Sequence, residues 1–316
     1  MTVGLGPSSI PAGENPMTTR RLLTILGILV WAAVALTAPS HTRAEKARSV
    51  VTISPDDNVS SCSDLHFRFD HRDAVVQSET REITKAEAST LRVTAEHNGG
   101  IDVEGWDKDS YSVTLCKGAE EGNDAQAILD EIHIWFQNGE LGVSGPSSHQ
   151  RWAAHFLIRS PKAAALEVSV FNGPLSLHQV DGQIQVRAKN GPVSVVGCSG
   201  ELNLNSQNGP LTLEDNRGKQ TVHAQNGPVT LSLSGDSWEG AGIDAQGTNG
   251  PLTVRVPSGY KSGVLVQSQG HSPFECRATA CSEGRKTWDD DHTQIEFGSG
   301  PMLVRVSTVN GPVSVN

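Results

Sequence analysis

An Asn-Gly-Pro phrase recurs along the second half of the chain and constrains the fold more than any other feature of the sequence. It begins at positions 172, 190, 208 and 226, which are 18 residues apart, and again at 249 and 310; a degenerate copy, SGPMLV, begins at 299. After each corner the residues alternate between apolar and hydroxyl side chains, as in Val193-Ser194-Val195. A period of two predicts a strand with an apolar inner face and a polar outer face. A second alternating segment follows in each copy, so the unit is strand, turn, strand, turn.

The proline argues against a hairpin at these turns. In a two-residue hairpin the residue after Asn-Gly donates its N–H across the turn, and proline has no N–H. At a solenoid corner the same residue begins a strand, where proline is tolerated. We therefore predict an all-β fold, a single-stranded parallel β-helix or β-solenoid with coils of 18 residues and one short helix. Each coil would add about 4.8 Å along the stack. An antiparallel sandwich is the alternative.

Asparagine and glycine at each corner supply the left-handed backbone that a sharp turn needs. Stacking of the corners would align the asparagine amides into a hydrogen-bonded ladder. The predicted corner residues are Asn172, Gly173, Asn190, Gly191, Asn208, Gly209, Asn226, Gly227, Asn249, Gly250, Asn310 and Gly311.

Weaker forms of the pattern occur upstream. Residues 91–106 and 132–145 each read as strand, Asn-Gly corner, strand. The spacings of 40 residues from Asn98 to Asn138 and 34 from Asn138 to Asn172 predict about two coils each. Between them, residues 123–132 predict a short helix with Ala127, Ile128 and Ile132 on its apolar face.

The chain divides into three predicted parts. Residues 1–44 form a signal segment with Met17 as an alternative start, because Arg20 and Arg21 precede an apolar run and small residues end at Ala44. An uncleaved membrane anchor is the alternative for this segment. Residues 45–90 are predicted to form an N-terminal cap, and residues 91–316 the β-solenoid, with a loop inserted at 270–294.

Export makes disulfides plausible for the five cysteines. Cys276 and Cys281 have the spacing of a small disulfide loop, and Cys62 and Cys116 form a candidate second pair. Cys198 is left over, and its position between Gly197 and Gly200 favours a buried thiol in a turn over a reactive one.

These features together resemble a known family. A signal segment, HNGGIDVEGWD at 97–107, a short Ala-rich helix and repeated NGPV or NGPL units are similar to the bacterial putative adhesin family, over about residues 90–316. The resemblance implies a β-solenoid of an exported or membrane-anchored protein and surface attachment. It brings no catalytic or binding residues. The cysteines and the 270–294 insertion depart from its simplest members.

Candidate sites for chemistry are sparse. Asp289, Asp291 and His292 lie together in the insertion and are weak candidates for binding a metal ion, because consecutive residues do not converge on one point. In the column after each first strand, Glu214 would lie two rungs from His178 and from Arg255, too far for a tight catalytic pair. We predict no catalytic residues and no cofactor.

The function that the sequence favours is a non-catalytic, exported structural or adhesive module of the bacterial cell envelope, located in the periplasm, on the cell surface or in the medium. The alternative is a carbohydrate-active enzyme, a polysaccharide lyase or hydrolase on a β-helix. The expected partners are an envelope protein or a glycan, with end-to-end self-association of the stacks. Membrane contact is expected only if residues 1–44 remain attached. A net charge of −10 without a basic run argues against nucleic acid.

Overall fold

The computed structural model describes residues 51–55, 59–147, 151–269, 272–289 and 292–316, all within the compact unit Arg48–Asn316. The predicted signal segment 1–44, with its alternative start at Met17, lies outside the described residues. No helix in the described part of the chain is long and apolar enough to cross a membrane.

Two large sheets make up the unit, and each successive pair of strands along the repeat contributes one strand to each sheet. In spatial order, sheet I contains β1 (Val51–Pro55), β2 (Leu65–Phe69), β3 (Arg72–Thr84), β6 (Ser110–Glu120), β9 (Trp152–Pro161), β5 (Ile101–Trp106), β11 (Leu175–His178), β13 (Val193–Val196), β15 (Leu211–Glu214), β17 (Val229–Ser232), β19 (Leu252–Arg255), β25 (Val313–Val315) and β21 (Phe274–Cys276).

Sheet II contains, in spatial order, β22 (Arg285–Trp288), β23 (His292–Phe297), β20 (Gly263–Gln269), β24 (Met302–Asn310), β18 (Gly242–Asn249), β16 (Lys219–Asn226), β14 (Glu201–Asn208), β12 (Gln183–Asn190), β10 (Ala165–Asn172), β4 (Thr90–Asn98), β8 (Glu140–Ser144) and β7 (His133–Gln137). The helical segments are α1 (Ala125–Asp130), η1 (Cys62–Asp64) and η2 (Thr279–Ser282).

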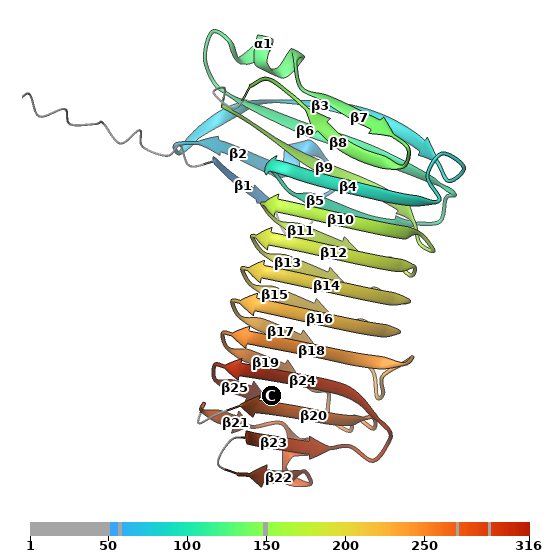
Figure 1. Ribbon diagram of the computed structural model, residues 1–316, viewed down its shortest axis with the longest axis vertical. Helices are drawn as coiled ribbons and strands as arrows, with labels where there is room; N and C mark the ends of the chain where they lie inside the picture. Colours follow the sequence, from blue (N-terminus) through green and yellow to red (C-terminus); the bar gives the residue numbers. More distant parts are fainter. Residues whose placement is uncertain (1–50, 56–58, 148–150, 270–271, 290–291) are drawn as a thin grey trace, which may run out of the picture. The chain divides into compact units, whose positions relative to one another are not determined.

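The repeat forms parallel rungs, visible from β10 to β18 in Figure 1. Leu204 of β14 lies opposite Val186 on one side and Val222 on the other, and all three side chains are buried. The all-β prediction is therefore confirmed. Both sheets are mixed, with antiparallel strands at one end of sheet I and at both ends of sheet II, and neither closes on itself, so the structure does not establish a single-stranded parallel β-helix throughout residues 91–316.

Glycine makes the predicted corners possible. Gly191 has φ of 133°, and a Cβ placed there would lie 2.1 Å from the carbonyl oxygen of Gly173 in the neighbouring corner. The close approach lets the Gly191 N–H donate to the carbonyl of Asn208, at 2.9 Å. Any side chain at this position would separate the rungs.

The asparagines at the corners form the expected ladder. The Nδ2 of Asn190 donates to the Oδ1 of Asn172 at 2.8 Å, and the Nδ2 of Asn208 donates to the Oδ1 of Asn190 at 2.9 Å. The same contact continues through Asn226, Asn249 and Asn310. The ladder uses amide groups that would otherwise face solvent, and it links every repeat corner.

The upstream spacing prediction was wrong. Asn98 lies directly opposite Asn172, so the coil of β4 and β5 stacks on the coil of β10 and β11 without intervening coils. Residues 107–164 form β6, helix α1, a hairpin of β7 and β8, and β9. Strand β6 pairs antiparallel with β9, whereas β8 and β9 pair in parallel with β4 and β5, on the side of that coil away from β10 and β11. Asn138 and Gly139, with φ of 52° and 79°, are the hairpin turn. No proline follows them, as the hairpin rule requires.

The predicted N-terminal cap is also more ordered than expected. Residues 65–69 form β2, and the polar segment after it forms β3, which pairs with β6 from Ala74 to Thr84. Helix α1 is present within its predicted range. Its buried side chains are Ala125, Ile128 and Leu129, whereas Ala127 is exposed, which corrects the predicted face.

The prediction of an inserted loop at 270–294 was wrong, because this segment contains β21, η2, β22 and the start of β23. The chain passes beyond the stack here and then returns, so that β24 lies between β18 and β20 (Figure 1). The degenerate copy SGPMLV leads into β24 of sheet II, and it is not followed by a strand of sheet I as the true corners are. The sequence did not reveal the strands of segment 270–294 because β22, for example, is exposed along its whole length and has no alternation of buried and exposed residues.

Replacement of Gly191 by alanine tests the corner geometry. We expect Gly191→Ala to lower the free energy of unfolding by about 3 kcal/mol, because it combines backbone strain with a clash against Gly173. Gly235→Ala is the matched control, since Gly235 also has positive φ, of 64°, but nothing lies within 4 Å of its Cβ position. We expect a cost of about 1 kcal/mol there. Urea denaturation of both variants measures the difference, and equal losses would contradict the close approach of the corners.

Candidate functional site

The acidic cluster singled out in the sequence does not assemble a metal site in the described residues. Asp289 and His292 close a turn, in which the His292 N–H donates to the Asp289 Oδ1 at 2.6 Å. Asp291 lies outside the described residues. No group of three His, Cys, Asp or Glu side chains positioned to hold a metal ion occurs in the part of the chain that the structure describes.

The column of His178, Glu214 and Arg255 has the arrangement expected from the repeat. Val196 lies between His178 and Glu214, and Ser232 lies between Glu214 and Arg255. Arg255 donates to Ser232 at 3.4 Å. The three candidate groups therefore remain on separate rungs, and this face of sheet I holds no close pair of them.

The cysteines pair as the sequence indicated. Disulfides join Cys62 to Cys116 and Cys276 to Cys281, and Cys198 is free and buried. Burial raises the pKa of the Cys198 thiol to about 11. A thiolate is the reactive form of cysteine, so this side chain is protonated and inert at neutral pH.

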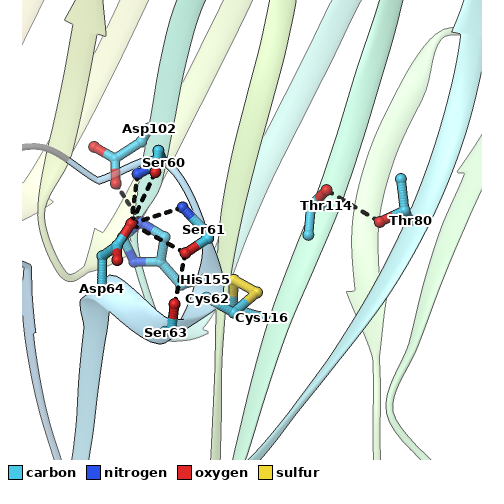
Figure 2. The surroundings of a disulfide bond; sticks show 10 residues. All are labelled: Ser60, Ser61, Cys62, Ser63, Asp64, Thr80, Asp102, Thr114, Cys116 and His155. Carbon is cyan, nitrogen blue, oxygen red and sulfur yellow. Dashed lines mark hydrogen bonds and ion pairs between the residues drawn. A yellow bond between two sulfur atoms is a disulfide. The ribbon is translucent and has the colours of Figure 1, made fainter.

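A pair formed by a buried histidine, His155, and an aspartate, Asp102, was not predicted from the sequence. The Nε2 of His155 lies 2.6 Å from the Oδ2 of Asp102, and the His155 side chain is fully buried. Figure 2 shows this pair near the disulfide between Cys62 and Cys116, and Cys116 is the cross-strand partner of His155. The other ring nitrogen of His155, Nδ1, has no hydrogen-bond partner in the described structure. The pair is enclosed, so we assign it to the interior of the N-terminal region.

Asp64 holds the segment that leads into η1. The backbone N–H groups of Ser60 and Ser61 each donate to the Asp64 Oδ2 at 2.9 Å. These bonds hold the pKa of the Asp64 carboxyl below its usual value, and the bond from the Ser60 backbone has the largest effect. Together with the Cys62–Cys116 disulfide they fix η1 against sheet I (Figure 2).

The strongest candidate for a binding site is a shallow depression of about 390 Å³ on the outer face of sheet II. Phe171 of β10 lies at its side with 44% of its surface exposed. The Lys189 Nζ lies 4.0 Å from the centre of the Phe171 ring. Side chains that can form hydrogen bonds line much of the remainder, among them those of Arg187, Asn205 and Gln207.

An irregularity in the strands accompanies this depression. Val170 pairs with Ala95 and Asn172 pairs with Asn98, so β4 uses one residue more than β10 to reach the corner. An extra residue of this kind bends a strand and interrupts the ladder. The depression lies where the regular stack meets this bulge, with Ala95 and Val170 in its lining.

The charges in the depression are unbalanced. Arg187 and Lys189 are both exposed and form no ion pair with any described residue. The only carboxylate in the lining is that of Glu96. Since the whole chain has a net charge of −10, two unpaired cations beside an exposed aromatic ring form a local exception.

The sequence contains a signal for this site, which is visible when equivalent positions of successive repeats are compared. The outward positions just before successive corners hold Phe171, Lys189, Gln207 and Gln225. An aromatic residue in a column of polar residues is the outlier.

Solved structures are similar to this chain, whereas protein-family profiles and curated proteins are not. No protein-family profile matches the sequence, and no curated protein matches it. Among solved structures, a "putative cell adhesion protein" from Clostridium sporogenes is similar over 76% of this chain and 99% of that chain, with 11% identity and a TM-score of 0.33. A "putative adhesin" from Bacteroides fragilis covers 76% of this chain and 96% of its own, with 13% identity and a TM-score of 0.33.

A "putative adhesin" from Parabacteroides merdae gives 10% identity and a TM-score of 0.34 over 76% of this chain and 96% of that chain. We transfer no residue role from these structures, because identities and TM-scores in this range do not place equivalent side chains. The proposed function therefore rests on the geometry of the described residues.

The raised pKa of Cys198 predicts how the thiol reacts. Because the folded-state pKa is about 11, the thiolate is absent at pH 8 and the native protein should not react with a thiol-specific reagent such as Ellman's. Denaturation without reductant should expose one reactive thiol per chain. Reaction of the native protein at pH 8 at the rate of an exposed cysteine would show that Cys198 is accessible.

Proposed function

We propose that this protein is an exported, non-catalytic β-solenoid that acts as an adhesive module of the bacterial cell envelope and binds an acidic polysaccharide. The observation that carries the proposal is the depression around Phe171, where an exposed aromatic ring, two unpaired cations and two amide side chains lie on one rigid sheet. Each group matches one chemical feature of a uronic-acid chain.

The aromatic ring suits the apolar face of a sugar. Phe171 is a large exposed hydrophobic residue in the otherwise polar outer row of β10. Arg187 offers a planar guanidinium, which binds carboxylates through two parallel hydrogen bonds. Asn205 and Gln207 each supply a donor and an acceptor for sugar hydroxyls.

The scaffold reduces the entropy lost on binding. The groups in the depression come from adjacent strands whose backbone hydrogen bonds fix their spacing. Binding groups held in place lose little conformational freedom when a ligand arrives. A chain that runs across the strands would meet one residue from each rung, about 4.8 Å apart.

The two disulfides support an exported location. Disulfides form and persist in oxidising compartments and are rare in the cytosol. Cys62–Cys116 and Cys276–Cys281 lie near opposite ends of the described chain. With the signal segment predicted from residues 1–44, they favour the periplasm, the cell surface or the medium.

A carbohydrate-active enzyme is the second candidate, and one observation bears on it. A second depression on sheet II contains two carboxylates, those of Glu167 and Glu201. Glu167 lies 3.4 Å from Arg92, and Glu201 lies 2.9 Å from Lys219. Glycoside hydrolysis needs one carboxyl group that carries a proton and one that does not. Both groups here are engaged by cations, which favours binding over catalysis.

Replacement of Phe171 by alanine tests the site. We expect the wild-type protein to bind an oligomer of galacturonic acid, and Phe171→Ala to weaken binding by roughly tenfold, because an aromatic contact contributes about 1 kcal/mol or more beyond its area. Gln225→Ala is the matched control, since Gln225 lies three rungs away in the same column. Isothermal titration calorimetry measures both variants. Equal affinities for the two would contradict the placement of the site.

The double variant Arg187→Ala/Lys189→Ala tests the acidic character of the ligand. We expect it to abolish the salt dependence of binding, because the screened charges are then absent. Tight binding of a neutral oligosaccharide of the same length, unaffected by salt, would reject the acidic class. Release of new reducing ends or unsaturated sugars during incubation with the polymer would reject the non-catalytic function.

A further inference from the structure

The two ends of sheet II differ in how their edge strands are protected. At one end, β7 is the last strand, and the backbone N–H of Ile134 on its outer side donates to the Glu79 Oε1 at 3.2 Å. A side chain of β3 thus occupies this edge. At the other end β22 is the last strand, and all four of its residues are exposed. Trp288 in this strand has 70% of its surface exposed.

The outward groups of β22 follow from its pairing with β23. The Asp289 N–H donates to the carbonyl of His292 at 3.0 Å, so Asp289 faces β23 with its backbone groups. Antiparallel ladders alternate between residues that bond inward and residues that bond outward. Lys286 and Trp288 therefore direct their N–H and C=O groups away from the sheet. An unprotected edge of this kind is a template for another strand.

We propose that β22 pairs with β22 of a second copy of this chain in a two-fold symmetric dimer. Two identical edge strands related by a two-fold axis perpendicular to the sheet run antiparallel and extend sheet II from one copy into the other. The sequence expectation of end-to-end association is thereby restricted to one end, because Glu79 occupies the edge of β7. The dimer is independent of the polysaccharide site.

Two symmetric registers pair three of the four residues of β22 with the second copy, one centred on Lys286 and one on Thr287. Directly opposed residues share a face, so the axis must pass at one residue of β22. With the axis at Lys286, the two Lys286 side chains would face each other, and like charges directly opposed are destabilising. With the axis at Thr287, each Lys286 faces Trp288 of the second copy, an arrangement that favours a cation–π contact.

The register centred on Thr287 is complementary in its other pairs as well. Each Arg285 then faces Asp289 of the second copy, which opposes unlike charges twice. Arg285 and Asp289 have side chains 73% and 60% exposed, so both can reach across the edge. On its own chain Arg285 also contacts Glu296, at 2.6 Å. The guanidinium would therefore lie between two carboxylates.

The backbone groups agree with the same register. Lys286 and Trp288 are the residues whose N–H and C=O groups point outward, and this register opposes them to each other. They would exchange two hydrogen bonds on each side of the axis. Thr287 would face its symmetry mate in a pair without backbone hydrogen bonds, where the Cα atoms are about 4.5 Å apart.

Cysteine substitution tests the dimer and its register together. Thr287→Cys places two thiols at a separation that a disulfide can bridge, whereas Lys286→Cys places each thiol opposite Trp288. We expect the purified full chain with Thr287→Cys to form a covalent dimer under a glutathione redox buffer, at least tenfold faster than Lys286→Cys. Non-reducing gel electrophoresis measures the rates. Faster coupling through position 286, or equal rates, would overturn the register.

Proline substitution tests the edge without disturbing the hairpin. Lys286→Pro removes an outward N–H, so the bonds between β22 and β23 and the thermal unfolding temperature should be preserved. We expect sedimentation velocity of the wild type to show concentration-dependent dimers. The variant should weaken dimerisation by on the order of tenfold to a hundredfold, because two hydrogen bonds are lost per dimer. A wild type that sediments as a single copy up to ~1 mM, or a folded variant that dimerises as well as the wild type, would overturn the proposal.

Discussion

The close approach of glycine backbones at the corners is the constraint on which the stack depends. Each corner glycine from Gly191 to Gly250 has a Cβ position within 2.2 Å of the carbonyl oxygen of the preceding corner glycine. This approach allows the N–H of one rung to reach the asparagine carbonyl of the next, as from Gly209 to Asn226 at 2.9 Å. Once the corners are fixed, the register of both sheets follows, and every second side chain enters a continuous apolar core. The asparagine ladder then adds side-chain bonds along the same line.

The sequence predicted the regular part of the fold because its information is local and repeated. Proline after Asn-Gly excludes a hairpin, as at Asn190, and the hairpin turn at Asn138 has no proline. The absence of proline does not by itself mark a hairpin, because Asn98-Gly99 is followed by Gly100 and is a corner. The interruptions were not predictable in this way. Strand β9 is buried on both faces and β22 on neither, so neither has the alternation that marks a half-buried strand. Asn98 stacks directly on Asn172 because the 58 residues 107–164 lie on the other side of the β4–β5 coil, which spacing alone does not encode.

The features with chemical character lie where the regularity ends. The depression around Phe171 adjoins the bulge between β4 and β10, and the open edge is the last strand of sheet II. The outward face of sheet I in the regular rungs instead presents a row of hydroxyl side chains, from Ser176 to Thr253. In a repeat scaffold of this kind, functional groups lie where the repeat is interrupted. In the sequence, such a position is a residue that differs in type from the equivalent residues of neighbouring repeats, as Phe171 differs from the polar Lys189 and Gln207. The disulfides Cys62–Cys116 and Cys276–Cys281, of which only the second was predicted from its spacing, leave the central rungs without covalent links.

The central claim is that a rigid polar sheet binds an acidic saccharide at one irregular position. Amide chemical shifts of the isotopically labelled protein, recorded during titration with an oligomer of galacturonic acid, test it most directly. The account predicts saturable shifts confined to the rungs of β4, β10, β12 and β14, largest near Phe171, Arg187 and Gln207. Shifts distributed along the hydroxyl rows of sheet I, or no shifts at millimolar saccharide, would contradict it.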